Sequence, residues 1–375
     1  AYPYVETTTA PVAGGILEDM PRLDYTDSSC PSLKLEPQRT NLIEYSEYLG
    51  SNWTFIRTNY ESNTATSPEG LTNAAKVFAN TSSGNHYFER VGFTGFTSGD
   101  YTYSFFAKSA GSDFVQIATS TGFDSRYQNF NLTTGEKASG DTDSSGYDTS
   151  ITPIGDDGWY RLTITANAPS TSVRFLIIPI LTDAARNPVF TGDGVNGFYF
   201  YGAQLEQDAT YPTSYIPTNG TSQTRLADFF DSSANFTNLF GDNQGTIYIE
   251  TDKRLFENTL GNESFIGFKD GSKFWRIIGS QNLIFTQSVN WGDTLAIYPA
   301  ATNPTKYLFK WDGSNTSFYV DGTLIASAPQ TAPFNPNEFG RSGIGVDMNS
   351  QELLNQFTLF PTALSDDECI ELTTI

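Results

Sequence analysis

The chain has 375 residues and a formal net charge of −21, because 42 residues are acidic and 21 are basic. Since proteins hold a phosphate backbone through Lys and Arg, this balance excludes nucleic acid and, for the same electrostatic reason, an anionic membrane surface as direct partners. The longest apolar run, Phe175–Leu181, is far shorter than the roughly 20 residues of a membrane-spanning helix, which argues against membrane insertion.

The composition is typical of β-structure. Aromatic residues make up 14% of the chain, with 29 Phe and 20 Tyr, and there are 32 Gly. Aromatic and β-branched side chains fit a pleated, half-buried surface, whereas Gly, Asn and Asp fit turns. The length exceeds that of one ordinary sandwich. The sequence therefore predicts an all-β protein with two antiparallel β-sandwich domains, jelly-roll-like and concanavalin-like, and an additional segment.

The additional segment is the N-terminal one. Residues 1–38 show little periodicity and contain five prolines, which are Pro3, Pro11, Pro21, Pro31 and Pro37. Proline cannot donate a ladder hydrogen bond and biases the residue before it towards extended backbone. We expect an extended N-terminal arm over residues 1–38 that covers either its own first domain or a neighbouring subunit.

Strand signals recur over residues 39–217, with Gly, Asp and Asn between them. In the first clear strand Tyr101, Tyr103, Phe105 and Ala107 fall on one face. The segments with such signals are Tyr101–Lys108, Phe114–Ala118, Arg126–Leu132, Trp159–Thr165, Val173–Pro179 and Asn196–Leu205. Short strands at this spacing favour a sandwich or jelly roll, which becomes the first domain.

A linker composition marks the end of this domain. Tyr211–Thr221 contains two prolines and a glycine, which interrupt regular elements, so the second domain is assigned to residues 218–375. Asp312-Gly313 lies between two apolar runs and predicts a hairpin, and Asp321-Gly322 predicts a further turn. The predicted strands here are Thr246–Glu250, Ser264–Phe268, Phe274–Ile278, Lys306–Trp311, Thr316–Val320 and Thr323–Ala326.

The chain ends in a predicted short helix. Ser365–Glu368 has the pattern of a capping box, and Leu364 and Cys369 occupy the positions of a hydrophobic staple. The acidic residues of this segment suit the positive end of the helix dipole, so capping explains them better than catalysis. Cys30 and Cys369 are expected to be free, partly buried thiols, with a bridge between them as the alternative.

Several stretches are similar to domains of bacteriophage structural proteins. Leu33–Leu42, with Gly202–Glu206 and Tyr211–Pro217, resembles the start and end of a carbohydrate-binding-module-like jelly roll found in fibre and spike proteins. Lys306–Gly322 resembles the centre of a concanavalin-like, or laminin-G-like, sandwich, and Phe360–Glu368 resembles the way that domain often ends in phage proteins.

The resemblance covers roughly residues 20–375 and implies a virion structural protein: a fibre, a spike or a capsid or tail decoration at the virion surface. It implies other virion proteins and host-surface glycans as partners, and a homotrimer. No catalytic residues come with it, and the Glu-x-Asp-x-(x)-Glu strand of concanavalin-like glycoside hydrolases is absent from the sequence. We therefore expect no enzyme. The alternatives are a polysaccharide lyase or hydrolase acting on envelope glycans and a secreted bacterial lectin or adhesin.

Nucleophilic catalysis has little support in the sequence. Its single histidine, His86, stands beside a turn without a Ser or Cys motif, and there is no Gly-x-Ser-x-Gly elbow. We expect His86 at the surface or at a strand edge. One histidine and two distant cysteines also do not make a usual zinc site.

Clustered acids raise the question of a metal or a carboxylate pair. Glycosidases need two carboxylates about 5–10 Å apart, and here acids cluster in loops, as at Asp141–Asp148 and Asp156–Asp157. Such loops are typical of solvated surface. Calcium is the alternative, because it prefers several carboxylate and carbonyl oxygens. Asp141–Gly146 partly has calcium-loop spacing but lacks the following Glu, so the metal stays unassigned.

Sugar binding calls for exposed aromatic faces with polar neighbours. The candidates are Trp53, Tyr60 and Tyr87 in the first domain and Trp275 and Trp291 in the second. Trp275 lies in an alternating strand, where a core position is the competing interpretation. Trp291, in the loop-like segment Val289-Asn-Trp-Gly-Asp293, is the preferred candidate.

Overall fold

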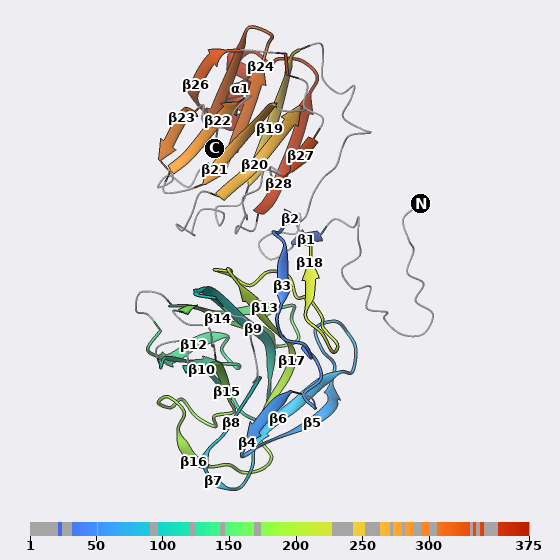
Figure 1. Ribbon diagram of the computed structural model, residues 1–375, viewed down its shortest axis with the longest axis vertical. Helices are drawn as coiled ribbons and strands as arrows, with labels where there is room; N and C mark the ends of the chain where they lie inside the picture. The colour runs from blue at the N-terminus through green and yellow to red at the C-terminus, as the bar shows by residue number, and fades with distance from the viewer. Residues whose placement is uncertain are drawn as a thin grey trace, which may run out of the picture. The chain divides into compact units, whose positions relative to one another are not determined.

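The computed structural model describes residues 22–24, 32–50, 52–90, 97–120, 125–142, 147–168, 174–226, 243–251, 263–270, 273–279, 282–288, 294–299, 306–330, 333–334, 338–340 and 352–374. The chain divides into two compact units, and each is considered by itself (Figure 1). The described part of the first unit lies within Arg39–Arg225. The second unit holds the described parts of Asp19–Gln38 and Leu226–Ile375.

The first unit is a sandwich of antiparallel sheets (Figure 1). Its strands are β3 Arg39–Asn41, β4 Trp53–Ile56, β5 Thr58–Ala65, β6 Ala74–Ala79, β7 Ser83–Asn85, β8 Tyr87–Arg90, β9 Gly99–Ala110, β10 Phe114–Ser120, β11 Tyr127–Asn131, β12 Glu136–Gly140, β13 Tyr147–Ile154, β14 Trp159–Ala168, β15 Arg174–Ile178, β16 Val189–Thr191, β17 Gly197–Gln207 and β18 Gln223–Arg225. In the described part, one sheet has the order β12-β11-β10-β15-β8-β4 and the facing sheet β13-β14-β9-β17-β6-β5. Two short ladders pair β16 with β7 and β18 with β3.

Alternation along the strands builds the core between these sheets. The predicted face of β9, with Tyr101, Tyr103, Phe105 and Ala107, is buried there and is confirmed. Phe175 of the opposite sheet stacks on Tyr103 with ring centroids 4.9 Å apart. The all-β fold class predicted from the composition is thus what the chain adopts.

Residues 209–218, here called the covering segment, lie on the outer face of the sheet that contains β9, β14 and β17. Thr102 Oγ1 donates to the carbonyl of Ala209 at 2.7 Å, and Gln204 Nε2 donates to that of Thr213 at 3.2 Å. Most of the segment predicted as a linker is therefore packed against the first unit. That unit continues to Arg225, because β18 pairs with β3.

The second unit is also built from antiparallel sheets. Its elements are β1 Arg22–Asp24, β2 Ser32–Leu35, β19 Gly245–Thr251, β20 Glu263–Asp270, β21 Lys273–Gly279, β22 Asn282–Ser288, β23 Thr294–Pro299, β24 Lys306–Trp311, β25 Asn315–Val320, β26 Thr323–Pro329, β27 Glu338–Gly340, β28 Glu352–Phe360 and α1 Asp366–Thr373. Over the described residues, one sheet has the order β1-β2-β28-β19-β24-β25-β26 and the other β23-β22-β21-β20-β27.

The described part of the predicted arm belongs to this second unit. Strand β2 pairs with β28 in antiparallel register, with Leu33 opposite Leu354, and β1 pairs with β2. These residues extend the sheet by main-chain hydrogen bonds.

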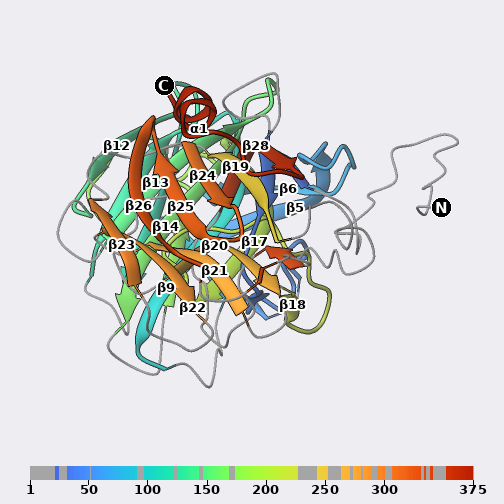
Figure 2. The same ribbon diagram turned by 90° about the horizontal axis from the view of Figure 1, so that it is seen from above.

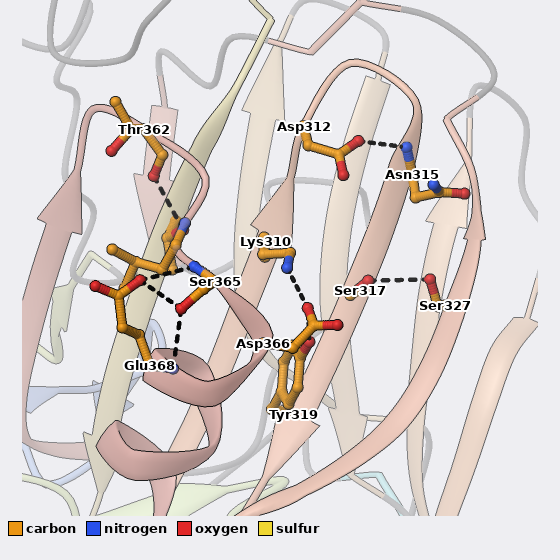
Figure 3. Close-up of polar contacts among 12 residues, drawn as sticks. Lys310, Asp312, Asn315, Ser317, Tyr319, Ser327, Thr362, Ser365, Asp366 and Glu368 are labelled. Carbon is orange, nitrogen blue, oxygen red and sulfur yellow. Dashed lines mark hydrogen bonds and ion pairs between the residues drawn. The ribbon is translucent and has the colours of Figure 1, made fainter.

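Both Asp-Gly turns of the second unit form where the sequence places them. Asp312 Oδ1 accepts the backbone N–H groups of Ser314 and Asn315 at 2.8 and 2.7 Å, which closes the β24–β25 hairpin (Figure 3). Asp321 and Gly322 have φ of 43° and 77°, the left-handed conformation that a two-residue hairpin loop of type I′ requires.

The predicted C-terminal helix is confirmed as α1, and it packs against β24, β25 and β26 (Figure 2). Its capping box is complete, since Ser365 Oγ accepts the N–H of Glu368 while the Glu368 carboxylate accepts that of Ser365 (Figure 3). Leu364 and Cys369 pack in one apolar cluster, as a staple predicts. Cys369 is a free, buried thiol, and burial raises its pKa to about 11, whereas Cys30 lies outside the described residues. No helix in the described part of the chain is long and apolar enough to cross a membrane.

Candidate functional site

A cleft of about 430 Å³ opens on the first unit, between the loop that follows β3, the paired strands β5 and β6, and the end of the covering segment. It is lined by Glu47, Tyr48, Ser62, Asn63, Asn73, Ala75, Pro217, Thr218 and Asn219. The lining thus combines one carboxylate, one tyrosine, hydroxyls and amides. This mixture can hydrogen-bond a polar ligand while one aromatic ring contacts its apolar face.

The carboxylate of Glu47 is fixed by two tyrosine hydroxyls. Tyr201 and Tyr215 both donate to Oε1, at 3.1 and 3.0 Å, and Asn73 Nδ2 lies 3.5 Å from Oε2. Burial raises the pKa of Glu47 above its ordinary value, and the nearby charge of Glu69 raises it further, while the donated hydrogen bonds oppose this shift. Glu47 is therefore a rigidly held acceptor at the cleft.

The covering segment places Tyr215 at this site, and the sheet holds the segment through buried polar side chains. Gln204 Oε1 accepts the N–H of Ile216 at 2.7 Å, and the fully buried Glu206 accepts both the N–H and the hydroxyl of Thr213. An irregular segment forms no regular backbone hydrogen bonds within itself. Side chains of the sheet must therefore provide hydrogen-bond partners for its buried N–H and C=O groups. These contacts give a physical reason for the Gly202–Glu206 and Tyr211–Pro217 motifs.

Asn73 brings an unused acceptor to the cleft. Its Nδ2 points to Glu47, while its Oδ1 is buried and has no hydrogen-bond partner. A buried polar atom without a partner is costly. A ligand that donates a hydrogen bond to this oxygen would remove that cost, but the Asn73 amide must first turn the oxygen towards the cleft.

Tyr48 is the exposed aromatic residue of the cleft, with 54% of its surface accessible. Its ring lies over Gly50, where an added Cβ would come within 2.2 Å of ring atoms. Tyr45 packs edge-on against the same ring, with centroids 6.2 Å apart. Gly50 and Tyr45 therefore hold the Tyr48 ring in place.

The structure does not bring the five predicted aromatic residues together. Trp53 is 8% exposed and packs against Phe88 and Phe200 in the core. Tyr60 is half-buried and stacked on Phe55.

The other three candidates lie elsewhere. Tyr87 is half-buried on β8, with the guanidinium of Arg174 above its ring at 5.9 Å. Trp275 belongs to β21, whose backbone pairing alone is described, and Trp291 lies outside the described residues. The assignment of a ligand to these residues stays a prediction.

The expectation of a surface position for His86 is wrong, whereas the residue does lie at a strand edge, between the end of β7 and the start of β8. The residue is fully buried, its ring packs on Phe190 at 4.3 Å, and its Nε2 lies 3.2 Å from the carbonyl oxygen of Asn80. The reason is the ladder between β7 and β16, which places Phe190 over the imidazole.

The acidic loops supply no metal cluster among the residues that the structure describes, in which no group of three or more His, Cys, Asp or Glu side chains could hold an ion. Asp141 instead accepts the N–H of Tyr127 at 2.7 Å, which joins the end of β12 to the start of β11.

Sequence reasoning missed Glu47, Tyr48 and Asn73. One signal was available, because Glu44-Tyr-Ser-Glu-Tyr48 alternates acids and tyrosines directly after the Leu33–Leu42 motif. Nothing in the sequence indicated that Tyr215 contributes to the cleft, because the composition around it is typical of a linker.

A scan against protein-family models and a search of the curated proteins found no match. Among solved structures, the chain is similar to the Ruminococcus gnavus IT-sialidase CBM40 bound to alpha2,3 sialyllactose, with 17% identity over 39% of this chain and 91% of that chain and a TM-score of 0.29. It is also similar to domains LG4-5 of the mouse laminin alpha1 chain, with 11% identity, coverage of 72% and 86%, and a TM-score of 0.24.

Proposed function

We propose that this chain is a non-enzymatic structural protein of a phage virion, a fibre, spike or capsid or tail decoration, whose β-sandwich domains bind host-surface glycans. The observation that carries the glycan-binding part is the cleft of the first unit, where the exposed Tyr48 ring stands beside the carboxylate of Glu47 and the amide of Asn73. A pyranose can place its C–H face on such a ring and its hydroxyls on such acceptors.

The virion part of the proposal is supported by the motifs shared with phage structural proteins. Three of these stretches meet in the first unit, since Asn41 Nδ2 donates to the carbonyls of Ala203 and Ile216 at 3.0 and 2.9 Å. These stretches are therefore explained by their contacts with one another in the fold, and they carry no catalytic group.

Binding without turnover agrees with the chemistry of the cleft. Hydrolysis of a glycosidic bond uses a pair of carboxylates, and Glu47 is the one carboxylate among the described lining residues. Its Oε1 is already engaged by Tyr201 and Tyr215.

The test is binding of the purified full chain to a glycan array and to envelope polysaccharides of candidate hosts. We expect Tyr48→Ala to weaken binding about 30-fold, the loss of about 2 kcal/mol that is typical of a tyrosine at the centre of a binding site. Val189→Ala, which changes a residue that is 70% exposed on β16 and outside the cleft, is the matched control and should bind like the unmodified chain.

Other results would overturn parts of the proposal. A loss on Trp291→Ala with none on Tyr48→Ala would move the site to the second unit. Absence of binding by the folded chain would leave a purely structural role, and release of oligosaccharide products would establish the enzyme alternative.

A further inference from the structure

The charges at the cleft are of one sign. The described lining residues include Glu47 and no Lys, Arg or His. Glu69, an exposed residue of the turn before β6, adds a second negative charge that acts on Glu47. Like charges repel, most strongly where water is partly excluded. An anionic ligand would therefore meet repulsion that these residues do not offset.

The unused hydrogen-bonding capacity of the cleft points the same way. Asn73 Oδ1 has no partner, and Glu47 Oε2 has its contact with Asn73 at 3.5 Å, which is long for a hydrogen bond. Both are acceptors. A hydroxyl or an amide N–H can donate to them, whereas a ligand carboxylate or sulfate cannot.

The position of the Glu47 carboxylate is fixed before a ligand arrives. Tyr201 belongs to β17 and Tyr215 to the covering segment, and their hydroxyls hold Glu47 from two sides. Ser46 holds Tyr215 in turn, with 2.6 Å between the two hydroxyl oxygens. A fixed acceptor cannot rotate away from an unfavourable ligand group, so the site discriminates by chemistry.

We infer that the Glu47 cleft selects neutral, hydroxyl-rich glycans and rejects glycans that carry a carboxylate or sulfate at the contact. This inference rests on the proposed glycan-binding function of the same cleft and specifies its ligand class. Glu47 is the main discriminating residue, Glu69 adds to the repulsion, and Tyr48 contributes affinity for either class.

The test is an array of matched pairs, in which each neutral oligosaccharide is printed beside the same oligosaccharide bearing one sialic acid or one sulfate. Lactose with alpha2,3-sialyllactose is one such pair. We expect the neutral member to bind at least tenfold more tightly. Equal or tighter binding of the anionic members would overturn the inference and leave glycan binding in place. Binding of neither member, by a folded chain, would overturn the proposed function itself.

The role of Glu47 is tested by Glu47→Gln, in which Oε1 can still accept from both tyrosines, and Nε2 can donate to Asn73 Oδ1 once the Asn73 amide turns over. We expect the ratio of neutral to anionic affinity to fall about tenfold. Because both affinities in this ratio are measured on the same variant, a general loss of affinity cancels. Glu69→Gln, at the exposed position, should lower the ratio by a smaller factor. An unchanged ratio in Glu47→Gln would contradict the assignment.

A measurement on the unmodified chain covers the case in which Glu47→Gln does not fold. The groups that face Glu47 are Tyr201, Tyr215, Asn73 and Glu69, and burial raises the pKa of both tyrosines, so they stay protonated at neutral and acidic pH. Lowering the pH through the raised pKa of Glu47 removes its charge. The difference in affinity between the neutral and the anionic member should therefore become smaller on acidification. A difference that does not change with pH would count against this mechanism.

Discussion

The two units cover the outer faces of their sheets in different ways. In the first, the irregular covering segment donates N–H groups to Gln204 and Glu206 of β17 and accepts one hydrogen bond from Gln204. In the second, helix α1 forms its own backbone hydrogen bonds, is capped at Ser365, and is joined to the sheet by the ion pair between Lys310 and Asp366, among other contacts (Figure 3). The first solution draws polar groups into buried positions, whereas the second buries mainly apolar ones.

This difference explains why the candidate site lies in the first unit. Glu206 is fully buried, and desolvation raises its pKa, an arrangement that a helix would not have required. The same segment supplies Tyr215 and Thr218 to the cleft. Between α1 and its sheet, by contrast, the buried residues of the cluster are Tyr248, Leu308 and Tyr319 of the strands and Cys369 of the helix. An irregular covering segment therefore requires polar side chains nearby, and such side chains can form a binding site.

The largest expected effect comes from the side chain that ties the covering segment to the sheet. Asn41 is fully buried; it donates to Ala203 and Ile216 and accepts from Ile43 and Leu205, all at 2.9–3.1 Å. Asn41→Ala leaves these backbone groups without partners, so we expect a loss of about 3–5 kcal/mol in the free energy of unfolding. Denaturant-dependent hydrogen exchange, resolved by peptide, would show the loss in the first unit.

Asn167→Ala is the matched control, because the amide of this exposed residue makes a surface contact to Asp100. Its effect should stay below about 0.5 kcal/mol. Equal losses for both asparagines, or a loss in the second unit, would show that the covering segment does not depend on Asn41.

A smaller effect is expected where the covering element is a helix. Ser365→Ala removes the side-chain oxygen that accepts the N–H of Glu368, so we expect a loss of about 1 kcal/mol, typical of a capping residue. Exchange should quicken in residues 366–373 before the sheet is affected. Glu368→Gln, which keeps an acceptor for the N–H of Ser365, should disturb the helix less than Ser365→Ala does. The reverse order would refute the capping argument.

The sequence predicted those elements whose signals are local. Alternation on β9, the Asp-Gly turns and the capping box each depend on residues a few positions apart, and all three are observed. The burial of His86 and the packing of the covering segment were not predicted, because their surroundings come from distant residues. Phe190 buries the histidine, and Gln204 and Glu206 hold a segment whose proline content is typical of linkers.

The candidate site was predictable in kind but not in position. An aromatic ring beside amides and acids was expected, yet Trp53 proved to be a core residue, while Tyr48 is held in the open by Gly50. Exposure of an aromatic ring depends on the strand register and on what covers the sheet. Neither is encoded near the residue itself, so composition and alternation could not distinguish Trp53 from Tyr48.

The smallest expected effect tests the ion pair that anchors α1. Lys310 and Tyr319 both donate to Asp366 Oδ1 and lower the pKa of this carboxyl, with the Lys310 hydrogen bond as the first cause. A lowered pKa means that the stabilisation is present above the ordinary pKa of Asp and is lost as the pH falls through the lowered value. Because 69% of the Asp366 side chain is exposed, solvent screens the pair, and Lys310→Met should cost about 0.5 kcal/mol at neutral pH.

Unfolding measured at neutral pH and at a pH that protonates Asp366 should show this cost disappearing. Lys306→Met, which removes a donor to the neutral carbonyl of Thr374, should show no such dependence. A pH-independent cost for Lys310→Met would mean that its alkyl stem, rather than its charge, holds the helix.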